Sequence, residues 1–199
     1  MKLKKSLTAL AIGGLCFATA PAGAVVNSLV FQGVTFETEA LDSDTLRLSI
    51  LNANSATGNW TGIGFLEAFE IKGIGTVTGV SITSGTSFAS FTPTVVNGLS
   101  ASSLGCGTGG TPGACFAASS PVALTGSMGW TIDFAGSNLD FFAPHLKVQF
   151  LTLATDTRKT GDLLSRDITT PIPEPEIYAL LAAGLGLMGW IARRRKLAA

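Results

Sequence analysis

Near its carboxyl end, the chain carries an apolar run that stops against a block of positive charge. Residues 177–192 contain no charged side chain. As a helix, this run would be about 24 Å long, a little shorter than the roughly 30 Å hydrocarbon core of a bilayer. A helix on a soluble core would need a polar face, and this one has none. The four residues that follow the run are all cationic: Arg193, Arg194, Arg195 and Lys196. We therefore predict a transmembrane helix at 177–192 and a basic cytoplasmic tail at 193–199, with the four cations as the stop-transfer signal.

The beginning of the chain has the layout of a removable export signal. Three of the first five residues are lysines, Leu7–Ala20 is apolar, and small residues follow at Ala22 and Ala24. The apolar part is short for a membrane span. We predict a signal peptide at 1–24, cleaved after Ala24 by signal peptidase and handled by the export machinery. The alternatives are a retained anchor and a lipoprotein signal at Cys16, although no small-residue box ends directly before that cysteine.

A proline-rich segment, residues 169–176, separates the middle of the chain from the apolar run. Alternating prolines fix φ and remove backbone donors, so we predict a stiff, extended and accessible linker. Pro173-Glu174-Pro175, a short apolar helix and a terminal cationic block follow one another in this order. Together with the export signal, these three parts resemble a PEP-CTERM sorting domain.

The resemblance implies a route and a partner. Pro173, Glu174 and Pro175 would be the sorting motif of a substrate for exosortase, a membrane-embedded protease-transpeptidase. That enzyme would act near the motif, remove the helix and pass the protein onward. The expected localisation is an exported precursor tethered to the inner membrane, then the outer envelope or extracellular matrix. The resemblance also implies an association with exopolysaccharide and biofilm.

The charge of the middle of the chain argues against one class of partner. Residues 25–170 hold 6 basic and 11 acidic side chains, a net charge of −5. Nucleic-acid binding requires clustered lysine and arginine against phosphate. We therefore expect no nucleic-acid partner.

Two cysteines remain after removal of the signal peptide, Cys106 and Cys115. An even pair in an exported protein is typical of a disulfide. The residues between them are mostly glycine and threonine, which makes closure easy. Two free thiols or a metal pair are the alternatives.

Apolar residues in the middle of the chain alternate with polar ones, which is typical of strands with one buried face. The clearest runs are Leu46–Ile50, Met128–Phe134 and Leu146–Phe150. Weaker candidates are Leu29–Phe36, Phe65–Lys72, Val77–Thr83, Phe88–Val96 and Pro121–Thr125. Glycine- and asparagine-containing breaks separate these runs. We predict an all-β ectodomain at 25–168, folded as an antiparallel, jelly-roll-like β-sandwich.

No catalytic constellation stands out in the sequence, and we predict a protein that is not an enzyme. The only histidine, His145, opens a predicted strand, and the chain has no G-x-S-x-G motif around a nucleophilic serine. Residues 105–110 match G-x-G-x-x-G, but they lie between the cysteines with no helix signal, so we interpret them as a flexible loop. A glycoside hydrolase built on two carboxylates is a less favoured alternative. Its candidate residues are Glu67, Glu70, Asp133 and Asp140.

A lectin-like module is the main alternative function. Trp60 follows a polar stretch, and if exposed it would stack on a sugar ring. Four acids crowd into eight residues and suggest either a calcium loop or a solvated acidic turn: Glu37, Glu39, Asp42 and Asp44. Apart from calcium, we expect no metal or cofactor.

Overall fold

The period-two pattern of the sequence produces the strands of the protein. The computed structural model describes residues 26–95, 98–107, 113–172, 181–188 and 193. In β3 (Thr45–Leu51), Leu46, Leu48 and Ile50 are fully buried, and the intervening Arg47 is exposed. The same alternation buries four side chains of β10 (Ser127–Ser137). In β11 (His145–Leu151), by contrast, residues 146–151 are all buried, so both faces of this strand are covered.

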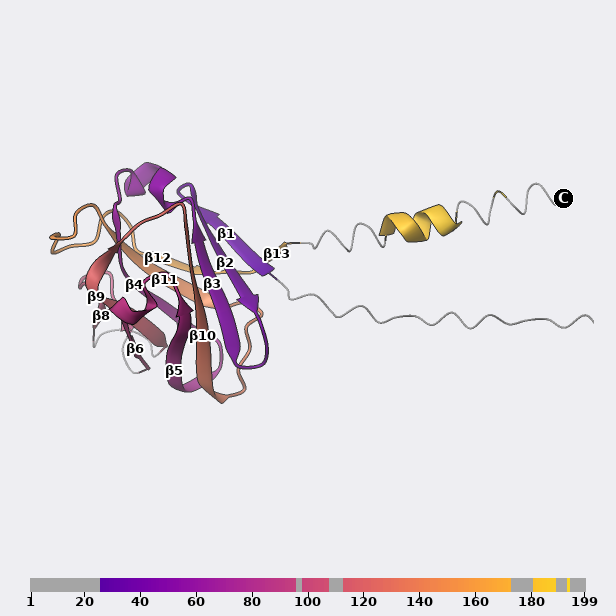
Figure 1. Cartoon of the computed structure of the whole chain (residues 1–199), viewed down its shortest axis with the longest axis horizontal. Helices are drawn as coiled ribbons and strands as arrows, with labels where there is room; N and C mark the ends of the chain where they lie inside the picture. Colours follow the sequence, from indigo (N-terminus) through magenta and orange to yellow (C-terminus); the bar gives the residue numbers. More distant parts are fainter. Residues whose placement is uncertain (1–25, 96–97, 108–112, 173–180, 189–192, 194–199) are drawn as a thin grey trace, which may run out of the picture.

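Two antiparallel sheets form the body of the molecule (Figure 1). The six-stranded sheet has the order β13-β1-β2-β3-β10-β5, and the five-stranded sheet has the order β12-β11-β4-β9-β6. The remaining strands are β1 (Val26–Phe31), β2 (Val34–Ala40), β4 (Phe65–Lys72), β5 (Thr76–Gly85), β6 (Phe91–Thr94), β7 (Gly98–Leu99), β8 (Cys106–Gly107), β9 (Ala114–Ala123), β12 (Leu164–Asp167) and β13 (Thr170–Ile172). Three short 3₁₀ helices lie at Ala53–Ser55, Gly58–Trp60 and Phe88–Ser90. The predicted antiparallel β architecture is therefore confirmed, whereas jelly-roll connectivity is not.

Aromatic side chains fill the space between the two sheets. Phe69 of β4 and Trp130 of β10 come from opposite sheets, and their ring centroids are 4.9 Å apart. Trp60 lies edge-on to Phe36 of one sheet and Phe150 of the other, with centroids 6.0 and 5.0 Å away. Such edge contacts between aromatic rings are favourable beyond the area they bury. One continuous core therefore joins the sheets.

Three of the weaker strand predictions need correction. In the one at 88–96, the first three residues form a 3₁₀ helix, and β6 begins only at Phe91. Residues 29–36 form parts of two strands, because Gln32 and Gly33 both have positive φ and make the turn between β1 and β2. Two-residue hairpin turns usually begin with asparagine, aspartate or glycine, so a turn that begins with glutamine was not predicted from the sequence. The prediction at 121–125 covers only the end of β9, which begins at Ala114. Its Ala- and Ser-rich stretch offers no alternation to detect.

The sandwich reaches further along the chain than residue 168. β13 pairs with β1 at the edge of the six-stranded sheet, in the segment that we assigned to the linker. Pro171 is tolerated in this edge strand because there is no further strand to which the missing N–H would have to donate. Of the predicted terminal segments, 1–24, half of 177–192 and nearly all of 193–199 lie outside the described residues.

A helical segment is described within the apolar run. Residues 181–188 are helical, and their four large apolar side chains are exposed: Leu181, Leu185, Leu187 and Met188. Among the described residues, no helix has the length and apolar character required to cross a membrane.

Candidate functional site

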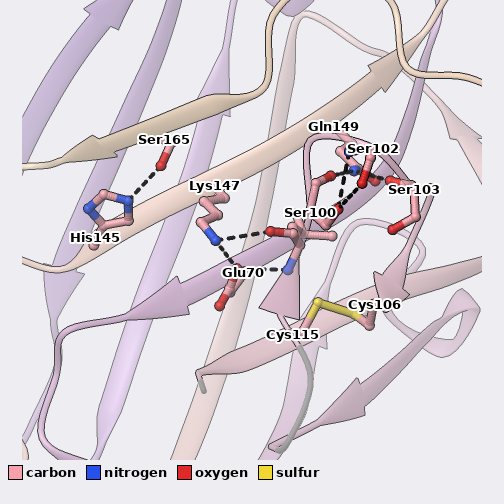
Figure 2. Close-up of polar contacts among 11 residues, drawn as sticks. Glu70, Ser100, Ser102, Ser103, Cys106, Cys115, His145, Lys147, Gln149 and Ser165 are labelled. Atoms are coloured by element: carbon pink, nitrogen blue, oxygen red, sulfur yellow. Dashed lines mark hydrogen bonds and ion pairs between the residues drawn. A yellow bond between two sulfur atoms is a disulfide. The ribbon is translucent and has the colours of Figure 1, made fainter. Parts of the chain in front are cut away.

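A buried ion pair lies on the face of the five-stranded sheet that points away from the core. Lys147 of β11 and Glu70 of β4 are directly opposite each other in the antiparallel register. The distance between Lys147 Nζ and Glu70 Oε2 is 3.1 Å (Figure 2). Glu70 is fully buried and Lys147 is 8% exposed. A pair so far from solvent requires further hydrogen bonds to offset the loss of hydration.

Those hydrogen bonds come from the segment 98–105, which we call the covering segment. The Leu99 N–H donates to Glu70 Oε2 at 2.8 Å, and Lys147 Nζ donates to the Leu99 carbonyl at 2.9 Å. The buried Gln149 accepts from the Gly105 N–H at 2.9 Å and donates to the carbonyls of Ser100 and Ser103. Three polar side chains of the sheet therefore satisfy the backbone of a loop that has few partners of its own. This cover explains why β11 is buried on both faces.

A disulfide between Cys106 of β8 and Cys115 of β9 fastens the end of the covering segment to the sheet (Figure 2). Leu99, Ala68 and Cys115 pack together under the segment as a small second apolar cluster. The predicted disulfide is confirmed. Of residues 105–110, which we interpreted as a flexible loop, Cys106 and Gly107 form the short strand β8, and residues 108–110 lie outside the described part of the chain.

Glycine is required where β9 begins next to the ion pair. A Cβ atom at Gly113 would lie 2.7 Å from Lys72 Cβ and 2.9 Å from Glu70 Oε1. Glu70 Oε1 is buried and has no hydrogen-bond partner among the described residues. Burial also lowers the pKa of Lys72, and the charge of Lys147 lowers it further. The site therefore holds its charges in a tightly enclosed setting.

His145 has two side-chain partners on the neighbouring edge strand β12. Its Nδ1 lies 2.6 Å from Asp167 Oδ1, and its Nε2 lies 2.9 Å from Ser165 Oγ. We predicted the position of His145 at the start of a strand, but not these partners. They belong to a polar segment with no apolar alternation. The one available signal was the i, i+2 spacing of Ser165 and Asp167, which places both on one face of any strand.

A surface cavity of about 740 Å³ lies beside this row of residues. Ser165 and Lys147 line it together with Leu99 of the covering segment. Two further cations, Lys159 and Arg166, and one acid, Asp162, also contribute to its wall. The cavity is therefore mixed in polarity, with an excess of basic side chains.

The structure corrects the prediction for Trp60. This side chain is fully buried in the core, and its Nε1–H donates to the Asp162 carbonyl at 2.8 Å. The polar residues before it form short 3₁₀ turns that fold the ring inward rather than presenting it at a loop edge. Trp60 therefore provides no platform for stacking on a sugar.

Two of the four acids of the predicted calcium loop, Glu39 and Asp42, already have partners. Glu39 pairs with Arg47 at 2.7 Å, and Asp42 Oδ1 accepts hydrogen bonds from the N–H groups of Asp44 and Thr45. These bonds lower the pKa of Asp42, and the neighbouring Asp42 raises the pKa of Asp44. Glu37 and Glu39 lie within β2 rather than in a loop. Over the described part of the chain, no three His, Cys, Asp or Glu side chains are grouped to hold a metal ion.

The carboxylates of the glycosidase alternative are not equivalent. Glu70 is paired with Lys147 under the covering segment and has no open face. Glu67 is partly buried, which raises its pKa. Asp140 Oδ1 accepts from the Phe142 N–H in an exposed turn. Glu70 is therefore unsuited to the role of a catalytic acid or base.

Comparison with known proteins identifies one region. The family model of the PEP-CTERM protein-sorting motif matches residues 171–196. No curated protein and no solved structure matches the chain. The match begins within β13 and includes Pro173, Glu174, Pro175 and all four terminal cations. The chain therefore carries a PEP-CTERM protein-sorting motif at residues 171–196.

Proposed function

We propose that this protein is exported, tethered to the inner membrane as a precursor, and sorted by an exosortase-type enzyme to the outer envelope or extracellular matrix. There it acts as a structural component associated with exopolysaccharide, rather than as an enzyme. The match to the sorting motif at 171–196 carries this proposal. The sandwich is the cargo, and the terminal segments direct its delivery.

The position of the motif relative to the fold supports processing. β13 ends at Ile172, and the Pro-Glu-Pro triplet begins at the next residue. Cleavage near the triplet would remove the apolar run and the cations without breaking a strand pairing. The product would keep all the strands of both sheets. A cargo of this kind loses its anchor and keeps its stability.

The carbohydrate-binding alternative has lost its main support. Trp60 is in the core, Glu39 is paired with Arg47, and Asp42 accepts hydrogen bonds within its own turn. The association with exopolysaccharide therefore rests on the sorting motif alone. Calcium dependence stays an untested prediction.

The intact mass of the protein recovered from the envelope and medium of its native host tests the proposal. We expect a product that begins at Val25 and ends between Pro173 and Glu176. Replacing Pro173, Glu174 and Pro175 together with alanine should leave the carboxyl end intact and keep the protein in the membrane fraction. Pro171→Ala and Glu176→Ala are matched controls that flank the triplet, and both should be processed. A wild-type product that starts at Val25 and still ends at Ala199 would refute sorting by exosortase.

A further inference from the structure

Ser165, His145 and Asp167 form a connected row of side chains on the outer face of the five-stranded sheet. His145 and Asp167 are opposite each other in the register of β11 and β12, and Ser165 is opposite Lys147. Ser165 and Asp167 are two residues apart on β12, so they share a face and reach the same imidazole from two sides. The row follows from strand pairing and requires no special loop.

The chemistry of Asp167 determines how the row is protonated. An ionised carboxylate only accepts hydrogen bonds, so the neutral imidazole must carry its proton on Nδ1, 2.6 Å from Asp167 Oδ1. Nε2 is then the acceptor, and the Ser165 hydroxyl is the donor 2.9 Å away. A hydroxyl that donates to a fixed imidazole nitrogen is positioned to lose its proton as it attacks.

Ser165 is also accessible to a reactant. Its residue is exposed, and it lines the cavity of about 740 Å³. Lys147 lines the same cavity, and two of its three N–H donors are used by Glu70 and Leu99. The ammonium group of Lys147 therefore adds positive charge to the wall of the cavity that Ser165 also lines. Leu99 and Phe31 supply apolar wall for an acyl chain.

We propose that Ser165 is a nucleophilic site that accepts an acyl group from a carboxylic ester, with His145 as its general base and Asp167 as a positioning residue. Ser165 Oγ forms a bond to the carbonyl carbon, and its proton passes to His145 Nε2. The bond from that carbon to the alkoxy oxygen breaks, and His145 returns the proton to the departing alcohol. The product is an O-acyl serine. No turnover is required, so the proposal is compatible with a structural component and is independent of sorting.

The full chain in detergent, treated with p-nitrophenyl acetate, tests this reaction. Trypsin cleaves after Lys159 and Arg166, so Ser165 falls in the peptide 160–166, which contains no lysine and only one serine. We expect acetylation of Ser165 in this peptide by mass spectrometry. His145→Gln should slow it by about 100-fold, the lower end of the effect of a general base. Ser165→Ala should abolish it.

Several controls separate a nucleophile from an ordinary surface serine. Ser102→Ala removes an exposed serine of the covering segment that is bonded to Ser100 instead of to histidine, and it should leave the Ser165 rate unchanged. Asp167→Asn should slow acetylation because its amide allows the wrong imidazole tautomer, and Asp167→Glu should restore part of the rate. Each variant is assayed only if its circular dichroism spectrum matches that of the wild-type protein and its disulfide is intact. If His145→Gln does not fold, the variants Asp167→Asn and Asp167→Glu decide the question. Acetylation of Ser165 that is no faster in the native chain than in urea, or that is unaffected by His145→Gln or by Asp167→Asn, would overturn the proposal.

Discussion

Glu70 and Lys147 depend on each other because both are removed from water. Loss of one partner leaves the other charge buried and unpaired, which typically costs about 3–5 kcal/mol. We predict that Glu70→Ala lowers the free energy of unfolding by this amount in urea denaturation. Replacing both residues with apolar ones, as in Glu70→Leu with Lys147→Met, should cost less than the single change. Glu39→Ala, which breaks the exposed pair with Arg47, is the control and should cost no more than about 1 kcal/mol. Equal losses for the buried and exposed pairs would contradict this account.

Glu67 gives the molecule a predictable pH dependence. It has no opposite residue in either neighbouring strand, because both pairings shift register there, and burial raises its pKa. A raised pKa means that the folded protein disfavours the charged form of this carboxyl. The charged carboxyl therefore lowers the free energy of unfolding at neutral pH, and this loss disappears as the pH falls below the pKa values of the folded and the unfolded states. We predict that Glu67→Gln raises the midpoint of thermal unfolding at pH 7 and that the difference vanishes at acid pH. A gain that persists in acid would require another cause.

At the scale of elements, the covering segment is held by one disulfide and a few side chains. In the chain-entropy account, closing so short a loop stabilises the fold by about 2–3 kcal/mol. We predict a loss of this size for Cys106→Ala combined with Cys115→Ala. Amide exchange should accelerate over residues 98–105 and remain slow in β3 and β10, which do not touch the segment. Exchange that accelerates uniformly would show that the segment does not open by itself.

The strands differ in how well their positions can be predicted from the sequence. β3, β10 and β11 were predictable because each alternates long apolar and polar residues, and the bounds of β4 match those expected from its sequence. The polar sequence of residues 155–170 is compatible with either a loop or an edge strand, and pairing with β11 is what makes β12 an edge strand. The disulfide followed from counting cysteines. The contacts of His145 and the ion pair of Glu70 arise from register between distant strands, which no local pattern contains.

At the scale of the whole molecule, the β-sandwich ends where the sorting triplet begins. β13 lies at the edge of the six-stranded sheet, and the sorting triplet begins where it ends. The boundary between cargo and anchor therefore lies four residues beyond the end predicted from the sequence, residue 168. The position of that boundary determines whether a processed chain keeps β13.

We predict that a chain starting at Val25 and ending at Pro175 unfolds at the same temperature as one that retains the apolar run. A chain ending at Ile168 should be less stable, because it loses β13 and leaves β1 as an open edge. Amide exchange in β1 should accelerate in that shorter chain, and its unpaired edge should promote association. Differential scanning calorimetry and light scattering measure the two effects. Pro171→Ala in the longer chain is the control, because it keeps the strand and changes only a residue at the sheet edge. If the chain ending at Ile168 is as stable as the chain ending at Pro175, β13 contributes nothing to the cargo and cleavage anywhere in 169–176 would be tolerated equally.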